Sequence, residues 1–388
     1  MANTAKEKRE IGSKGLDLLQ KQKLYQRVVL GRKPPETAQA RQPKAPPKKK
    51  TTPVLRAFGN HIGIDLGTAT TVVYVEGKGV VMREPTLVAV NRRTDQVVAM
   101  GKRARQMIGR TPEHIEVIQP IQLGVINDYE ITEQLFEHIF RKVQDASPKI
   151  FSPSVIIGVP CCTSQAEINA VRDAVIDAGA RRVGIVYEPF AAAVGIDLPL
   201  VGETAVMVID IGGGTSDTMI LAGGEIVASD SIRLAGDAFD KAIVEGLREK
   251  KQIIIGERTA EDLKVATMQS ANEQKVFSVQ GRSSSTGLPL EADVSFDEIV
   301  RFLDPCLGKI VEYVGTFVGR SSPEVQADLK NNNIYFVGGG PAIHAFPRKI
   351  EEALNLRIVV PENATGLVAR GTALIAQSPE QYEKYFLS

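Results

Sequence analysis

Two stretches decide the fold of this chain, and the first reads Ile62-Gly-Ile-Asp65-Leu-Gly67-Thr68-Ala-Thr70-Thr71-Val-Val-Tyr-Val75. It consists of an apolar strand that ends in an aspartate, a Gly/Thr turn and a second apolar strand, which predicts a β-hairpin. The same order returns 145 positions later as Met207-Val-Ile-Asp210-Ile-Gly212-Gly213-Gly214-Thr215-Ser216-Asp217-Thr-Met-Ile-Leu221. Two matching hairpins in one chain predict two related domains that face each other.

The chemistry of both turns points to a phosphate. Glycines let successive backbone N–H groups converge on an anion, and threonine hydroxyls add donors. Asp65 and Asp210 would repel phosphate, so a cation must lie between them, and two carboxylates with phosphate oxygens and waters suit Mg²⁺. The pair therefore predicts a Mg-nucleotide between two domains. The alternative is two ordinary tight hairpins, because Asp and Gly are common in turns.

Two other nucleotide-binding motifs do not match this sequence. The chain has no G-x-x-x-x-G-K-[ST] sequence, and Phe336-Val-Gly338-Gly339-Gly340-Pro341 is not the G-x-G-x-x-G fingerprint. This late stretch predicts a strand, a glycine turn and the first turn of a helix, where the backbone can approach a flat ring or a phosphate closely.

From Asn60 onward, short apolar runs bounded by glycine alternate with helical patterns, which indicates an α/β body. Residues 155–159 read as a buried strand. Ser164-Gln-Ala-Glu167 then predicts a capping box for a helix that stops at Gly179.

The composition is that of a globular protein, with 388 residues, 43% of them apolar and 24% charged. The formal net charge of the whole chain is only +1, but the charge is unevenly distributed. Residues 1–57 hold 15 Lys/Arg and 4 Asp/Glu, so this tail has a net charge of +11 and the remaining residues have a net charge of −10. We predict that this tail is disordered. Its Lys48-Lys49-Lys50 cluster would attract an anionic membrane; the alternatives are a segment that docks a partner and a tail that only aids solubility. We do not expect nucleic acid as a partner.

Three cysteines cannot form a disulfide framework, so a reducing cytoplasm fits best. The charged N-terminus is unlike a signal peptide. The four histidines lie too far apart in the sequence to suggest a zinc site.

Beyond the two hairpins, several segments carry a family resemblance. They are Gly109-Arg-Thr-Pro112, Ala170-Val-Arg-Asp-Ala174, Glu188-Pro-Phe-Ala-Ala-Ala193, Ala235-Gly-Asp237 and Gly256-Glu-Arg-Thr-Ala-Glu261. The chain from about Asn60 to Gln377 resembles bacterial actins of the MreB and MamK type, within the superfamily of actin, heat-shock chaperone ATPases and sugar kinases. The resemblance implies an actin-like ATPase fold around a central nucleotide cleft, with domain I at 58–202, rejoined by 361–388, and domain II at 203–360.

The resemblance also assigns roles at the site. Glu188 would position or deprotonate the attacking water, with Asp210 and Thr215 beside it, and Asp65 and Asp210 would hold Mg²⁺ through waters. An alternative for Glu188 is a purely structural role at the first turn of a helix. The residues expected to contact ATP or ADP are Asp65, Gly67, Thr68, Thr70, Gly213, Gly214, Thr215, Gly236, Asp240, Glu261, Lys264, Gly338, Gly339 and Gly340.

Two local features qualify the resemblance. Thr259 is expected to cap a helix that presents Glu261 and Lys264 to the adenosine, and the alternative is a surface ion pair of little energetic value. Ser216-Asp217 follows Thr215 where MreB proteins usually have Thr-Glu, so this corner is closer to the chaperones.

By resemblance, the chain hydrolyses ATP and polymerises head to tail into cytoskeletal filaments for cell shape or intracellular organisation. The alternative is a non-polymerising ATPase, chaperone or small-molecule kinase of the same fold. Ile150 and Phe151 lie between prolines, where they would enter lipid or, alternatively, begin the strand at 155–159. The expected location is the cytoplasm, at the inner face of the membrane if these residues bind it.

Overall fold

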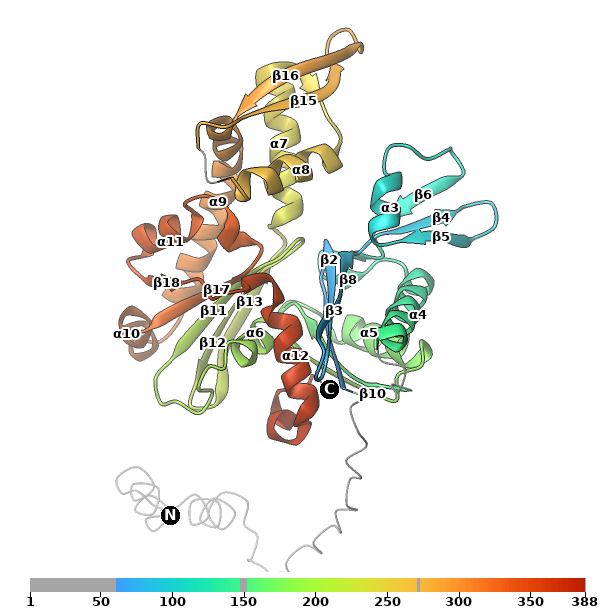
Figure 1. The fold of residues 1–388 in the computed structure, drawn as a ribbon. Helices are drawn as coiled ribbons and strands as arrows, with labels where there is room; N and C mark the ends of the chain where they lie inside the picture. Colours follow the sequence, from blue (N-terminus) through green and yellow to red (C-terminus); the bar gives the residue numbers. More distant parts are fainter. Residues whose placement is uncertain (1–60, 147–151, 271–272, 388) are drawn as a thin grey trace, which may run out of the picture. The chain divides into compact units, whose positions relative to one another are not determined.

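The computed structural model describes residues 61–146, 152–270 and 273–387 (Figure 1). The predicted tail, residues 1–57, and the pair Ile150 and Phe151 lie outside these ranges, so neither prediction about them is tested. Within the described ranges, no helix is both long enough and apolar enough to cross a membrane.

Two five-stranded sheets contain the predicted hairpins. The first sheet has the order β10-β9-β1-β2-β3 and comprises β1 (His61–Leu66), β2 (Thr70–Val75), β3 (Gly79–Pro85), β9 (Ser154–Val159) and β10 (Arg182–Tyr187). Strand β1 is antiparallel to β2 and parallel to β9, which is in turn parallel to β10. The parallel pairs need helical crossovers, which the alternation of strand and helix patterns in the sequence anticipates.

The second sheet repeats this plan. Its order is β13-β12-β11-β17-β18, and it comprises β11 (Val206–Ile211), β12 (Ser216–Ala222), β13 (Glu225–Ile232), β17 (Asn333–Gly338) and β18 (Arg357–Val359). Strand β11 is antiparallel to β12 and parallel to β17, as β1 is to β2 and β9. The internal repeat and the α/β fold class predicted from the sequence are confirmed.

Helices α6 (Glu188–Gly195) and α12 (Leu367–Gln377) share one apolar core with residues of both sheets. Phe190 and Ile375 belong to this core, as do Ile156 of the first sheet and Val208 of the second. Figure 1 shows α12 running beside α6 between the two sheets. This shared core therefore joins the two sheets.

Each sheet also has a core of its own. Helices α4 (Tyr129–Ala146) and α5 (Gln165–Asp177) cover the first sheet, and the second is covered by α7 (Gly236–Lys251), α9 (Phe296–Gly319), α10 (Pro323–Asn331) and α11 (Phe346–Leu354). The capping box predicted for α5 is confirmed, because Ser164 and Glu167 bond each other's backbone N–H groups. The predicted stop at Gly179, which has φ of 107°, is confirmed as well.

Smaller elements complete the described chain. The shorter helices are α3 (Lys102–Met107), α8 (Glu257–Met268) and the 3₁₀ turns Gly340–Ala342, Ala364–Gly366 and Pro379–Tyr385. The small sheets contain β4 (Val88–Asn91), β5 (Gln96–Met100) and β6 (Ile115–Ile118); β7 (Ile121–Gln122) and β8 (Val125–Ile126); and β14 (Ile253–Ile254), β15 (Val276–Ser283) and β16 (Pro289–Ser295).

Candidate active site

The two predicted turns meet. A Cβ atom added to Gly214 would lie 2.6 Å from the Thr68 hydroxyl, and one added to Gly213 would lie 2.7 Å from the Ala69 Cβ. The Thr68 hydroxyl also accepts a hydrogen bond from the backbone N–H of Gly124 at 3.1 Å. The structure therefore brings the glycines and threonines of the two hairpins together, as the sequence repeat predicts.

Each turn is held in shape by neighbours. In the first, the buried Thr86 donates its hydroxyl hydrogen to the Gly67 carbonyl at 2.7 Å and lies 2.9 Å from the Thr71 hydroxyl, beside Thr70 at the start of β2. Thr86 was not predicted from the sequence, because no local motif marks it.

In the second turn, the Gly212 N–H bonds the Thr215 carbonyl at 3.0 Å, and Thr215 itself is buried. The first turn of α7 packs on this turn through the Gly236 N–H, which bonds the Gly212 carbonyl at 3.2 Å. A helix N-terminus thus lies directly against the predicted phosphate-binding glycines, where its partial positive charge favours an anion.

Four carboxyl groups gather beside these turns. Asp210 and Asp217 are buried, while Asp65 and Glu188 are partly accessible. Burial raises the pKa of Asp65 to about 7 and of Asp217 to about 6. Burial, reinforced by the neighbouring carboxylates, also raises the pKa of Asp210 and Glu188 well above the usual range. Together these groups form a concentration of negative charge that a cation would relieve.

The donor set fits Mg²⁺ held through water. Oxygen ligands are those Mg²⁺ prefers, and it commonly keeps several waters. Among the described residues no group of acidic, histidine or cysteine side chains is arranged to chelate a metal directly. The carboxylates of Asp65 and Asp210 therefore fit the predicted contact with Mg²⁺ through waters.

These pKa shifts predict how the stability of the metal-free protein depends on pH. The unfolded chain releases the Asp65 proton near pH 3.8, whereas the folded chain keeps it until about pH 7. Between these values the folded state binds more protons, so this contribution to stability is full below about pH 4 and is lost as pH rises to about 7. Without Mg²⁺ or nucleotide, the melting temperature should therefore fall between about pH 4 and pH 7, and Asp65→Asn should flatten that slope. An unchanged slope in this variant would contradict the assignment.

Glu188 lies at the junction between β10 and α6. It is the first residue of the helix and precedes Pro189, so it has the position of a helix-dipole carboxylate. It is also part of the carboxylate cluster, because Asp217, Asp65 and Asp210 each raise its pKa. Glu188 therefore lies both at the start of a helix and within the carboxylate cluster.

Lys264 and Asp240, both predicted to contact the nucleotide, face each other inside the protein. The Lys264 Nζ donates to Asp240 Oδ2 at 2.8 Å and to the Gly236 carbonyl at 2.9 Å. The buried Asp240 Oδ1 has no hydrogen-bond partner among the described residues. Helix α8 begins at Glu257 with Gly256 at its N-cap, so the prediction that Thr259 caps it is wrong, because Thr259 already lies inside the first turn.

Glu261 has a different partner from Lys264. Its carboxylate pairs with Arg105 of α3 at 2.9 Å, and Arg105 also pairs with Asp262 at 2.7 Å. Glu261 and Lys264 therefore lie on one helix but do not share a partner. Arg105 was missed by the sequence analysis, since nothing local connects it to a residue 156 positions away.

The late glycine turn packs on the strand that carries Asp210. Gly338 ends β17 with φ of 80°, and a Cβ there would collide with Asp210 Oδ1 and the Ile211 carbonyl. Gly339 donates its N–H to the same carbonyl at 2.8 Å, and Gly340 begins the 3₁₀ turn. The structure thus brings all three glycines to the edge of the carboxylate cluster.

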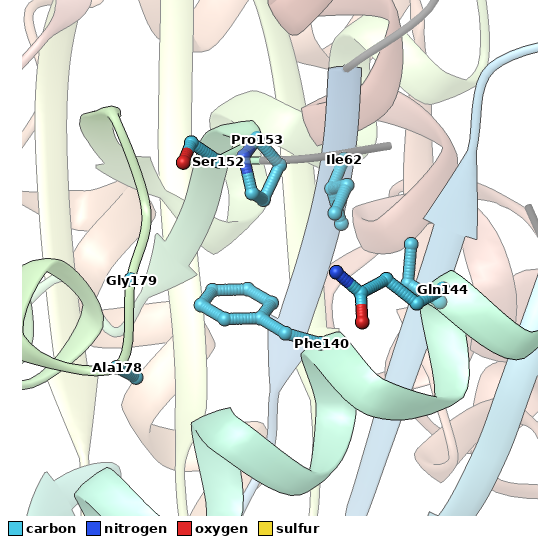
Figure 2. A pocket seen from close by; sticks show the side chains of 8 residues that line it. Ile62, Phe140, Gln144, Ser152, Pro153, Ala178 and Gly179 are labelled. Carbon is cyan, nitrogen blue, oxygen red and sulfur yellow. The ribbon is translucent and has the colours of Figure 1, made fainter. Parts of the chain in front are cut away.

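Two cavities lie away from these residues. One, of about 240 Å³, lies beside the start of β1, where Figure 2 shows Ile62, Phe140 and Gln144 near Ser152 and Pro153. The other, of about 450 Å³, lies between β13 and α9. Neither is lined by a predicted site residue.

Comparison with known proteins agrees with this architecture. The family model described as MreB/Mbl protein matches residues 59–384. The cell shape-determining protein Mbl of Bacillus cereus is 37% identical over 329 residues, which covers 84% of this chain and 98% of that protein.

Solved structures agree as well. MreB5 of Spiroplasma citri, crystallised with ADP and with AMPPNP, matches with a TM-score of 0.77 and 32% identity. In the ADP form the match covers 83% of this chain and 98% of that one. A double helical filament of MamK matches with a TM-score of 0.67 and 23% identity over 82% of this chain and 98% of that one, which is a likeness of fold. The chain therefore belongs to the MreB/Mbl family of bacterial actins and has the actin-like fold.

Proposed function

We propose that this bacterial actin binds Mg-ATP between its two hairpin turns, hydrolyses it and polymerises head to tail into cytoskeletal filaments. The observation that carries the proposal is the cluster of Asp65, Glu188, Asp210 and Asp217 beside two matching glycine turns. The family supports it, since MreB5 of Spiroplasma citri was crystallised with ADP and AMPPNP. The proposed domains are 58–202 with 361–388, and 203–360; separate apolar cores support this division.

Each part of the site has a proposed task. Gly67, Thr68, Thr70, Gly213, Gly214 and Thr215 would hold the phosphates, with Gly236 of α7 behind them, and Asp65 and Asp210 would hold Mg²⁺ through waters. Gly338, Gly339 and Gly340 would lie along the adenosine on one side, with Asp240, Glu261 and Lys264 on the other. The free Asp240 Oδ1 supports this placement, because a buried acceptor needs a donor such as a ribose hydroxyl.

Hydrolysis would proceed by proton transfer to Glu188. A water oxygen bonds to the γ-phosphorus as the bond to the ADP oxygen breaks, and the Glu188 carboxylate takes the water proton. Asp65 and Asp210 would hold Mg²⁺, which would offset negative charge on these carboxylates and on the phosphates. Burial raises the pKa of Glu188 most, and the charges of Asp217, Asp65 and Asp210 add to it; relief of charge on Asp65 and Asp210 would favour the ionised form that a base requires.

Filament formation is tested by sedimentation. With Mg-ATP, the wild-type protein should pellet above a critical concentration, and the pelleted mass should rise linearly beyond it, as expected of an open head-to-tail contact. The protein incubated with EDTA in place of Mg²⁺ is the control and should stay in the supernatant. Absence of sediment across a broad range of concentrations would favour a non-polymerising enzyme of the same fold.

We place the filaments in the cytoplasm, with contact to the inner face of the membrane through residues 1–57, Ile150 and Phe151. The net charge of +11 on the tail supports attraction to anionic lipid. Sedimentation with phosphatidylglycerol vesicles tests this: the full chain should co-pellet with them, and a chain lacking residues 1–57 should do so less. Equal binding of the two would remove the tail from this role.

A further inference from the structure

The two hairpins differ at one chemically important position. Asp65 pairs across the first hairpin with Val72, whereas Asp210 pairs across the second with Asp217. Residues directly opposite each other in an antiparallel pair project from the same face of the sheet, so Asp217 lies beside Asp210. Asp217 is only 1% exposed, and the proposed function gives it no task.

Asp217 joins the two sheets directly. Its Oδ1 accepts the backbone N–H of Cys161 at 2.7 Å. Asp217 lies in β12 of the second sheet, whereas Cys161 follows the end of β9 in the first sheet. This hydrogen bond is part-buried and charge-assisted, a type that is shorter and stronger than a bond between neutral groups.

The bond ends close to Glu188. Val159, two residues before Cys161, pairs with Tyr187, the residue that precedes Glu188. A Cβ on Gly158 would lie 3.1 Å from the Glu188 Cγ, so the end of β9 packs against the glutamate itself. Any movement of the loop at Cys161 relative to the second sheet would therefore displace Glu188 relative to Asp210.

We infer that Asp217 is a positioning residue for hydrolysis, which holds the loop after β9, and through it Glu188, at a fixed place relative to Asp210. The inference rests on the proposed ATPase activity. A displacement of about 1 Å can lower a rate by roughly 100-fold, which is the scale of effect that such a bond can control.

Substitutions separate the hydrogen bond from the charge. Asp217→Ala removes the acceptor, so kcat for phosphate release should fall about 10- to 100-fold, while the affinity for Mg-ATP changes less than about threefold. Asp217→Asn keeps an acceptor oxygen for the Cys161 N–H without the charge, and should retain kcat within about threefold of wild type. Asp230→Ala is the matched control, because Asp230 lies on β13 and pairs with Arg320 at 3.6 Å near the surface; its kcat should match that of wild type.

The outcomes distinguish this inference from the proposed function. If the wild type releases no phosphate, the proposed ATPase activity fails. If the wild type is active and Asp217→Ala is equally active, the positioning role fails. If Asp217→Asn is as impaired as Asp217→Ala, the charge rather than the bond matters, and the inference is overturned. Thermal melting of each variant, with folded protein required, separates these results from unfolding.

Discussion

Replacing Glu188 with alanine should lower the rate of phosphate release from Mg-ATP by roughly 10²- to 10⁴-fold, the usual contribution of a general base. Binding of the nucleotide should survive, because the change removes a negative charge from a cluster that already contains three aspartates. The test measures phosphate release in a single turnover, and the Kd for a fluorescent ATP analogue is measured on the same sample.

Glu188→Gln is the matched variant for this test. Glutamine has nearly the same shape and keeps the first turn of α6, but it cannot accept the water proton at neutral pH. Both variants should therefore be slow. If glutamine were as active as glutamate, the role of Glu188 would be structural, at the start of the helix, and the catalytic assignment would be wrong.

The second large effect concerns the core between the two sheets. Gly371 of α12 faces α6 so closely that an added Cβ would overlap the Ala191 carbonyl oxygen and lie 2.6 Å from the carbonyl carbon. Gly195 of α6 is equally confined against the Leu367 carbonyl. Gly371→Ala must push the helices apart, and we expect a loss of about 3 kcal/mol or more in the free energy of unfolding. Thermal melting should show a clear fall in Tm, or the protein should fail to fold.

Gly308→Ala provides the control for helix propensity. Gly308 lies within α9, is exposed, and has no neighbour within 4 Å of an added Cβ. Alanine there should stabilise the protein by about 0.5–1 kcal/mol, because it reduces the backbone entropy lost on folding. A Gly371→Ala variant as stable as Gly308→Ala would mean that α6 and α12 are not held in close contact.

The structural features that could be predicted from the sequence are those that short local motifs mark. The hairpin turns at Gly67 and Gly213 and the aspartates that precede them are marked by alternating strand and glycine signals. The start of α5 at Ser164 is marked by a capping box, in which both partners lie within four residues. Such features form from neighbours in the chain and need no distant information.

The parts that were missed depend on partners far away in the chain. Nothing near Gly371 reveals that it must meet Ala191, and nothing near Arg105 reveals Glu261. The Cys161 N–H has no signature at all, since every residue except proline carries one. In the sequence, Asp217 stands out because it differs from the residue that MreB proteins usually have in this motif. Its role, however, follows only from the pairing of β11 with β12 and from the hydrogen bond between the two sheets.

The central claim is that the two hairpins together hold one Mg-nucleotide, and isothermal titration with AMPPNP tests it most directly. We expect a single site per chain in the presence of Mg²⁺. The affinity should weaken at least about tenfold in EDTA, which corresponds to about 1.4 kcal/mol, and by a similar factor in Asp210→Asn. Binding of equal strength with and without Mg²⁺, or no binding at all, would contradict this claim.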